Sequence, residues 1–238
     1  MIECALSPRT FDCPQKLGPG FHLPARMTVL LLASGELAIV SPIPIDDQLA
    51  ARIAALGEVR FLIAPNLLHH LYLQAASERY PSALVLAPAG LRKKRPELRI
   101  DGELSAELPA GLLAAVDVLR FEGAPALDEY VLFHRATRTL VVTDLVFNMV
   151  RPEGWLTHLV LWLVGCRGRL AQSRLVRQLV KERSAASHSV QQMLERPFET
   201  LIVAHGEIVR EAARAQLTDA LRWLLPSPRR ALPEAAQS

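Results

Sequence analysis

The sequence is poor in cysteine and in aromatic residues. Its 238 residues include three cysteines, Cys4, Cys13 and Cys166, and aromatic residues make up only 5% of the chain. No CxxC pair occurs, so we expect neither a disulfide framework nor a dithiol redox site. The first residues lack the apolar core of a secretory signal. Together with the reduced thiols, this predicts a cytoplasmic protein.

The chain also lacks an apolar run of the roughly 20 residues that a membrane-spanning helix needs. We therefore predict no transmembrane segment. The most apolar stretch is WLTHLVLWLVG, residues 155–165. It is either a buried helix or a surface that docks on something apolar, and the buried helix is the simpler interpretation.

Several functional motifs are absent. The sequence contains no GxSxG of a serine hydrolase, and neither the GxxxxGK[ST] nor the GxGxxG loop that binds phosphate groups. Its formal charge is only +3, and the basic run Arg92–Arg95 is typical of a solvated loop. Arginines over residues 167–183 leave contact with nucleic acid or anionic lipid open, but few aromatics accompany them for base stacking. We predict no specific nucleic-acid partner.

Hairpin-like and strand–helix patterns alternate through most of the chain. Alternating apolar segments predict hairpins over residues 27–42 and 129–144, and further strands at 58–65, 83–88 and 200–205. Helical periodicity predicts helices at 46–57, 66–81, 170–195 and 207–225. This mixture predicts an α/β fold with mixed β-sheets. We divide the chain into an N-terminal arm (1–20), a single domain (21–225) and a C-terminal tail (226–238).

Polar side chains follow three of the predicted strands. Asn66 and His70 come after the first, Asp144 after the second and His205 after the third. Ligands of open α/β folds bind beyond the carboxyl ends of strands, so these residues are expected to share a pocket. Two imidazoles and one carboxylate are ligands that Zn or Fe accepts. His70, Asp144 and His205 are therefore the predicted metal ligands, with Asn66 as a further pocket residue.

His70 is chosen over its neighbour His69 because adjacent helical positions point about 100° apart. On a helix that begins at Asn66, His70 is one turn further along the same face. Simpler roles also fit each residue. Asn66 and Asp144 are common capping residues, and a lone histidine near a strand end is often only hydrogen-bonded.

The order of these motifs resembles the metallo-β-lactamase superfamily, αββα sandwiches of metal-dependent hydrolases. The segments APN…HHL…YP, FH…TRTLVVTD and VAHGE are more similar still to a bacterial and plant domain of unknown function within it. The resemblance covers roughly residues 25 to 225 and implies an αββα sandwich with mixed sheets. Active members carry HxHxDH where this chain has NLLHHL, which puts Leu68 in place of a ligand. The region FEGAPALDEY also lacks the usual third histidine.

This reduced motif leaves two functional hypotheses. The first is a metal-dependent hydrolase with one Zn or Fe ion, acting on a small-molecule substrate that the sequence does not identify. The second is a non-catalytic binding or scaffold protein on an inherited hydrolase fold, with a polar pocket and no metal. Metal content would discriminate between them, and the sequence does not predict the oligomeric state.

Overall fold

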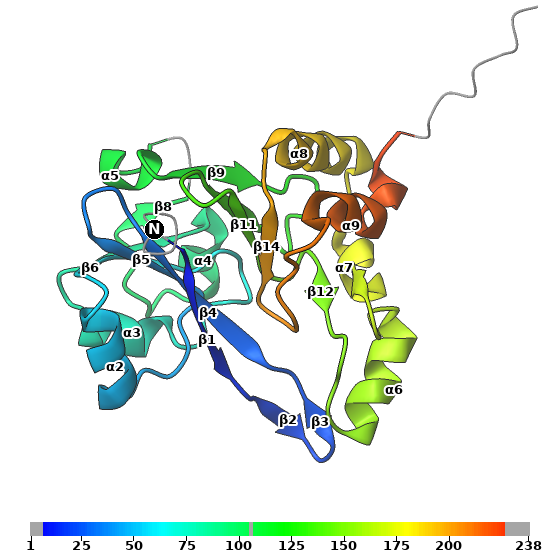
Figure 1. Cartoon of the computed structure of the whole chain (residues 1–238), viewed down its shortest axis with the longest axis horizontal. Coiled ribbons are helices and arrows are strands. Elements are labelled where there is room, and N and C mark those ends of the chain that lie inside the picture. Colours follow the sequence, from blue (N-terminus) through cyan, green and yellow to red (C-terminus); the bar gives the residue numbers. More distant parts are fainter. Residues whose placement is uncertain (1–6, 105–106, 227–238) are drawn as a thin grey trace, which may run out of the picture.

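Two β-sheets packed face to face form the centre of the protein (Figure 1). The computed structural model describes residues 7–104 and 107–226. The larger sheet has the strand order β1 (Arg9–Cys13), β4 (Ala25–Leu31), β5 (Leu37–Val40), β6 (Val59–Ile63), β7 (Leu84–Ala87) and β8 (Gly102–Glu103). The smaller has the order β14 (Thr200–Val203), β11 (Thr139–Val142), β10 (Tyr130–His134) and β9 (Val116–Arg120).

Both sheets are mixed. In the larger sheet, β4 pairs antiparallel with β1 and β5, whereas β5 to β8 run parallel. In the smaller sheet, β10 is antiparallel to β9 and β11, whereas β11 and β14 are parallel. Parallel neighbours end at the same edge of a sheet, so the loops after β11 and β14 lie side by side.

The alternation of side chains along the strands explains the sandwich. In β14, Ile202 packs between the sheets, whereas Leu201 and Val203 join the cluster on the outer face. Because successive side chains of a strand point to opposite faces, a fully apolar strand needs cover on both sides. Each sheet therefore has the other sheet on one face and helices on the other.

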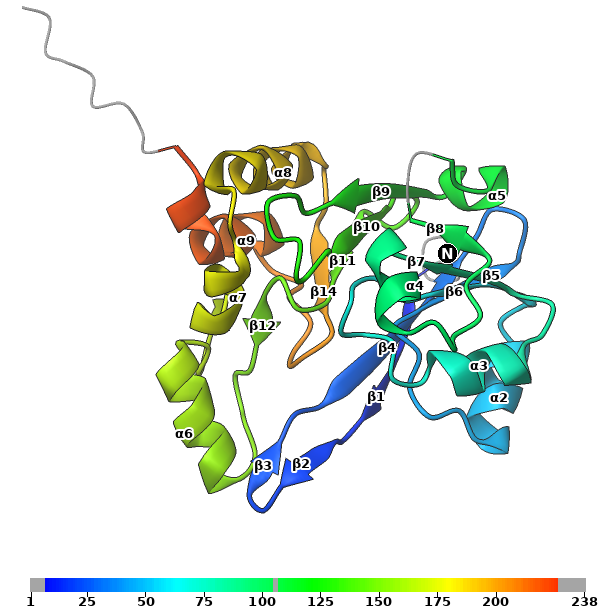
Figure 2. The ribbon, with the colours of Figure 1, turned by 180° about the vertical axis from the view of Figure 1, so that it is seen from behind.

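Helices cover the outer face of each sheet (Figures 1 and 2). The larger sheet is covered by α2 (Asp47–Ala54), α3 (Leu73–Arg79) and α4 (Ala89–Lys94). The smaller is covered by α7 (Arg174–Leu179), α8 (Arg183–Glu195) and α9 (Ala213–Ala220), which is followed by the 3-10 turn η1 (Arg222–Leu224). The predicted αββα sandwich is confirmed.

The remaining elements lie around this sandwich. They are β2 (Lys16–Gly18), β3 (Phe21–His22), α5 (Ala110–Leu113), β12 (Phe147–Asn148), α6 (Trp155–Val164) and β13 (Leu170–Ala171). In both views α6 lies at the periphery, next to the β2–β3 hairpin (Figures 1 and 2). No helix within the described ranges is long and apolar enough to cross a membrane.

The N-terminal arm is more ordered than the sequence predicts. Residues 9–13 form β1, which pairs along its whole length with β4, and residues 16–18 form β2. An ion pair joins Arg26 to Asp12, with Nε–Oδ1 at 2.7 Å. The prolines and glycines around these strands do not prevent pairing, because β1 is an edge strand. The division into arm, domain and tail stays a prediction, and residues 227–238 of the tail lie outside the described part.

All four predicted helices are shorter in the structure, and in two of them a backbone contact outside the helix is the cause. The predicted helix 170–195 is interrupted between α7 and α8, where the backbone N–H groups of Lys181 and Glu182 donate to the carbonyl of Gly123. The predicted helix 207–225 starts only at Ala213, because Val209 forms a β-bridge with Leu201. In both places a backbone hydrogen bond to a residue outside the predicted helix replaces the hydrogen bond that a helix would make four residues back.

Two further corrections concern the basic run and the apolar stretch 155–165. The basic run is helical up to Lys94, and its side chains Arg92 and Lys93 are exposed to solvent as predicted for the run. Residues 155–164 form a helix, α6, but it is not buried. Within it only Thr157 and Leu161 are buried, whereas Trp155 is 70% exposed. The buried-helix interpretation of this stretch is therefore wrong.

Candidate metal centre

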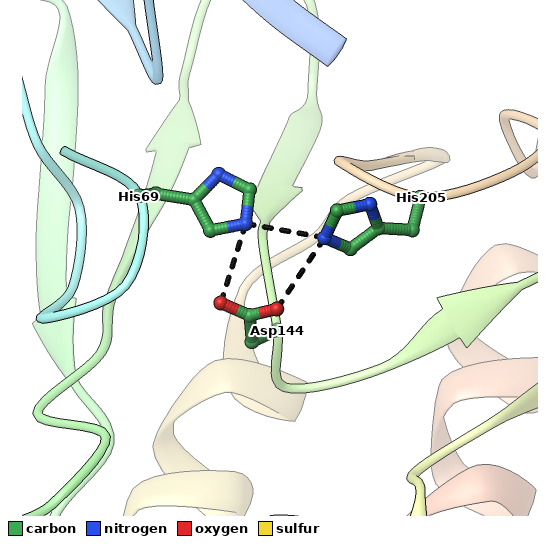
Figure 3. Close-up of side chains that lie close together, drawn as sticks. All are labelled: His69, Asp144 and His205. Carbon is green, nitrogen blue, oxygen red and sulfur yellow. Dashed lines mark hydrogen bonds and ion pairs between the residues drawn. The ribbon is translucent and has the colours of Figure 1, made fainter. Parts of the chain in front are cut away.

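Three loops at one edge of the sandwich bring His69, Asp144 and His205 together (Figure 3). His69 follows β6 of the larger sheet, whereas Asp144 and His205 follow β11 and β14 of the smaller sheet. It is the only group of three or more potential metal ligands of this kind within residues 7–104 and 107–226. The site therefore spans the seam between the two sheets.

The three side chains form a small triangle. The two Nε2 atoms of His69 and His205 are 3.2 Å apart. Asp144 Oδ2 is 3.2 Å from His69 Nε2, and Asp144 Oδ1 is 3.4 Å from His205 Nε2. Zn–N and Zn–O bonds of about 2.0–2.1 Å in a tetrahedral arrangement place ligand atoms about 3.3–3.4 Å apart. The nitrogen–nitrogen distance and the shorter nitrogen–oxygen distance to each imidazole are thus close to the spacing of ligands around one zinc-like ion.

Hydrogen bonding behind His205 decides which of its nitrogens faces the triangle. Its Nδ1 lies 2.7 Å from the carbonyl oxygen of Pro24, which can only accept a hydrogen bond. Nδ1 therefore carries the proton, and in the neutral ring the Nε2 lone pair points at Asp144 and His69. A lone pair facing a carboxylate is repulsive unless a cation lies between them. The donor set fits a bound metal ion for this reason.

His69 is held in a similar way by Ser41. The Ser41 hydroxyl is 2.6 Å from His69 Nδ1, so the opposite nitrogen, Nε2, faces the triangle. Ser41 directly follows β5 and has a left-handed backbone with φ of 54°, which costs a non-glycine residue energy. Metal-binding histidines commonly have such a partner on their second nitrogen, which fixes the ring.

The triangle is shielded on one side and open on another. The ring of Phe147 stacks on His205 with centroids 4.9 Å apart and an angle of 10°. On the open side lies a cavity of about 180 Å³ that reaches His69, Asp144 and His205. Its remaining walls are Gln15, Ala25, Ser41, Pro42, Leu68, Leu71 and Tyr72. A small molecule entering this cavity would meet the three side chains directly.

A buried polar network supports the triangle from below. The amide nitrogen of Asn66 donates to Asp144 Oδ2 at 2.8 Å and to Glu129 Oε2 at 3.1 Å. Glu129 in turn accepts the backbone N–H groups of Thr143 and Asp144, both at 2.8 Å. Asn66 and Glu129 are fully buried. Asn66 thus lies next to the triangle, where it positions Asp144.

Charge is concentrated on this network. Burial opposes a positive charge on His69, yet the Asp144 carboxylate and, beyond it, Glu129 outweigh this and raise the pKa of His69 above its usual value. Burial likewise opposes ionisation of Asp144, but the two imidazoles hold the pKa of Asp144 well below its usual range. Burial and the charge of Asp144 raise the pKa of Glu129. Of the two carboxyl groups, Asp144, at one corner of the triangle, is therefore the one whose negative charge the surroundings favour.

The predicted ligand His70 lies outside the triangle. Its Nδ1 accepts a hydrogen bond from Arg95 Nη1 at 3.2 Å, and burial together with the charge of Arg95 lowers the pKa of His70. The choice of His70 assumed a helix that begins at Asn66, but α3 begins at Leu73. In the preceding turns, Asn66 Oδ1 accepts the backbone N–H of His69 at 2.7 Å. This turn presents His69 to the site instead of His70.

Sequence reasoning missed Ser41 and Glu129. Ser41 follows a predicted strand, and its position beside a strand end is the one signal that could have suggested it. Glu129 offers no such signal, because a lone acidic residue before an apolar strand is normally exposed. Only the packing of both sheets shows that Glu129 is buried beneath Asp144.

Solved structures show which fold this is. A crystal structure of VMB-1 superposes with a TM-score of 0.62 at 11% identity, over 91% of this chain and 93% of that one. The DIM-1 metallo-β-lactamase exposed to ceftazidime gives 0.60 at 14% identity, over 91% and 93%. The metal-soaked Flv1 flavodiiron core from Synechocystis sp. PCC6803 gives 0.61 at 14% identity, over 91% of this chain and 58% of that one.

Sequence comparison adds nothing to this. No protein-family model matches the chain, and no curated protein matches it. Identities of 10–14% over nine-tenths of the chain show a shared fold. The chemistry of the site must be argued from the residues that this chain carries there.

Proposed function

We propose that this protein, whose chain has the metallo-β-lactamase fold, is a metal-dependent hydrolase with one Zn or Fe ion held by His69, Asp144 and His205. One observation carries the proposal. Two imidazole nitrogens lie 3.2 Å apart, each lies 3.2–3.4 Å from one oxygen of the Asp144 carboxylate, and each imidazole is fixed from behind so that Nε2 faces the others. The sequence prediction named His70 in place of His69.

Three protein ligands leave a coordination position free, which is the pattern of catalytic metal sites. A bound ion would act as a Lewis acid and lower the pKa of a water molecule at that position. In this chain, Asn66 and Glu129 hold the Asp144 carboxylate in place, while Ser41 and the Pro24 carbonyl orient the two imidazoles. A second fully liganded ion lacks partners, since Leu68 stands where active relatives carry a histidine.

The substrate is proposed to be a small molecule that fits the 180 Å³ cavity beside the triangle. Polar groups line its floor, and Leu68 and Leu71, 49% and 65% exposed, line its rim. We also propose that the protein works in the cytoplasm with its three thiols reduced. Cys166 fits this, since burial raises the pKa of its thiol to about 11.

Adjacent histidines provide a matched test. Protein purified without added chelator is analysed for Zn and Fe, alongside His69→Ala and His70→Ala variants. We expect about one equivalent of metal in the wild type and in His70→Ala, and its loss in His69→Ala. The metal-loaded wild type and the His69→Ala variant are then compared on esterase and phosphodiesterase substrates.

The alternative, a non-catalytic binding or scaffold protein, makes the opposite prediction. It requires metal-free wild-type protein that takes up no zinc in equilibrium dialysis. Retention of metal by the folded His69→Ala variant, or its loss from His70→Ala, would contradict the ligand assignment. Circular dichroism and a melting curve confirm that each variant is folded.

A further inference from the structure

We propose that the outward face of α6 docks on an anionic phospholipid membrane. The side chains Trp155, Leu159, Trp162 and Leu163 are defined here as the α6 face. They follow the i, i+4, i+7, i+8 spacing of a single helical stripe. In an ordinary surface helix such a stripe faces the core, whereas here it faces solvent.

The exposure of these side chains is large. Trp155 is 70% exposed, Trp162 63%, Leu163 53% and Leu159 44%. Tryptophan is highly buried on average, and a cluster of exposed large apolar side chains marks an interaction surface. Leu175, 60% exposed, extends the same apolar character to the start of α7. The α6 face is therefore an interaction surface that the protein's own core does not use.

Contacts from the inner side of the helix hold α6 in place, while Trp155 of the α6 face lies against Gly20 of the hairpin. On the inner side, the Thr157 hydroxyl accepts the backbone N–H of His22 at 2.8 Å, and the Gly20 carbonyl accepts the N–H groups of Leu156 and Thr157. Leu161 packs into a small cluster with Met149, Cys166 and Ala171. These contacts anchor α6 to the β2–β3 hairpin and the neighbouring loop.

Exposed arginines flank α6 on both sides in the sequence. Arg151 precedes the helix, and Arg167 and Arg169 follow it; all three are exposed and have no acidic partner among the described residues. Arg174 is also exposed, and its Nη1 donates to the carbonyl of Leu163 at the end of α6. Glu153 is the one acidic residue in the stretch 151–174. Exposed tryptophan and leucine beside unpaired arginines match the chemistry of an anionic lipid surface.

A membrane explains these features better than a second copy of the chain. A twofold interface places the same patch on both subunits, so a dimer through the α6 face would bring two sets of arginines together. The helix lies at the periphery of the molecule, where a flat surface could reach it (Figures 1 and 2). Its 10 residues span about 15 Å, which suits a helix lying in the headgroup region and excludes one that crosses it.

Vesicle sedimentation tests the proposal. The full-length protein is mixed with vesicles of phosphatidylcholine alone or of phosphatidylcholine with phosphatidylglycerol. We expect binding to the anionic vesicles that is about tenfold or more stronger than to the neutral ones and weakens with salt. A Trp162→Ser/Leu163→Ser variant should lose about tenfold or more in affinity. Leu113→Ser, at an exposed leucine on α5, is the matched control and should bind as the wild type does.

The arginines are tested by a second pair of variants. Arg167→Gln/Arg169→Gln should weaken binding to anionic vesicles severalfold. Arg92→Gln/Lys93→Gln removes the same charge from the exposed basic run of α4 and should leave binding unchanged. A blue shift of tryptophan fluorescence on binding should disappear in Trp162→Ser/Leu163→Ser. Trp223, whose indole N–H donates to Gln172, lies outside the α6 face and should contribute little.

Three results would overturn the proposal. They are absence of binding to either vesicle, equal binding to both, and a dimer in solution that the Trp162→Ser/Leu163→Ser substitutions dissolve. The proposal does not depend on the metal centre. Metal content measured on the same variants separates failure of the α6 face from failure of the proposed hydrolase site.

Discussion

The two imidazoles of the candidate metal centre are oriented by single hydrogen bonds on the nitrogens that face away from it. For His205 the partner is the backbone carbonyl of Pro24, which a substitution of the Pro24 side chain would not remove. For His69 it is the hydroxyl of Ser41, which a substitution can remove. Ser41 keeps a left-handed backbone although it is not glycine, which suits a residue retained for its side chain.

Replacement of Ser41 by alanine should weaken metal binding and leave the fold intact. Without the hydroxyl, the ring of His69 loses the contact that fixes its orientation, and loss of such a partner typically lowers affinity by about 10–100-fold. Zinc affinity is measured by competition with a chelating dye. The control is Ser34→Ala in the turn of the β4–β5 hairpin, where the hydroxyl is exposed. Equal zinc affinities of the two variants would contradict this role.

His134 should make stability depend on pH independently of the metal site. It is 1% exposed, and its Nε2 donates to the carbonyl of Leu31 at 3.0 Å across the two sheets. Burial lowers the pKa of His134 below its usual value of 6.5. The unfolded chain therefore binds more protons below pH 6.5, and the free energy of unfolding falls as the pH drops through that value.

The contribution of His134 is isolated by comparing variants. Urea unfolding is measured between about pH 5 and pH 8 for the wild type and for His134→Asn. The difference in unfolding free energy between them should shrink as the pH falls, because only the wild type loses this contribution. His188→Asn, at an exposed histidine on α8, should follow the wild type at every pH. A constant difference between His134→Asn and the wild type would refute the assignment.

At the scale of elements, the loop after β14 positions His205 through its glycine. Gly206 has φ of +100°, and a Cβ there would lie 2.0 Å from the carbonyl oxygen of Asn148. The neighbouring backbone makes close hydrogen bonds to the same strand, with Asn148 N donating to the carbonyl of His205 at 3.0 Å. This close approach explains why a glycine follows His205 at the end of the buried strand.

Gly206→Ala should therefore destabilise the protein and displace His205. The left-handed backbone alone costs about 1–2 kcal/mol, and the clash with Asn148 adds to it. Gly35→Ala is the control, because Gly35 also has a left-handed backbone, φ +83°, but nothing within 4 Å of the added Cβ. Thermal melting should fall further for Gly206→Ala than for Gly35→Ala, and only Gly206→Ala should lose metal. Equal falls in melting temperature would show that the contact with Asn148 does not affect stability.

At the scale of the whole molecule, the residues of the candidate metal centre come from both sheets. His69 comes from the larger sheet, and Asp144 and His205 come from the smaller one. Two further contacts cross the same seam, since Arg26 Nη1 donates to the carbonyl of Val203 at 2.9 Å and His205 Nδ1 to that of Pro24. An ion in the centre would add a third link that exists only in the folded protein.

Zinc should accordingly raise the melting temperature of metal-free protein. Binding to the native state alone stabilises it by about 2.7 kcal/mol when free zinc is a hundred times the dissociation constant. The shift should vanish in Asp144→Asn, which keeps the shape of the side chain but removes its charge, and should persist in His70→Ala. The measurement is differential scanning calorimetry with and without zinc. A melting temperature that zinc leaves unchanged would favour the scaffold hypothesis.

The sequence by itself determined the sheets and named two of the three residues that meet at the candidate site. Apolar strands such as TLVV and TLIV need cover on both faces, and so their pattern specifies a covered sheet wherever they occur. The position of a strand also fixes the position of the residues directly after it, so the places of Asp144 and His205 were predictable. These are local properties of short segments, and tertiary contacts reinforce them.

Only the tertiary structure decided between His69 and His70, and only it exposed α6. The helical periodicity of the sequence continues back to Asn66. In the folded chain, however, the Asn66 side chain forms hydrogen bonds with Asp144, Glu129 and the turn that presents His69. Likewise, the apolar stretch 155–165 gives no indication of whether anything covers it. The position of Asn66 depends on Glu129 and Asp144, which are more than 60 residues away in sequence. The exposure of α6 depends on the absence of a covering segment among the described residues. Local propensity contains no information about either.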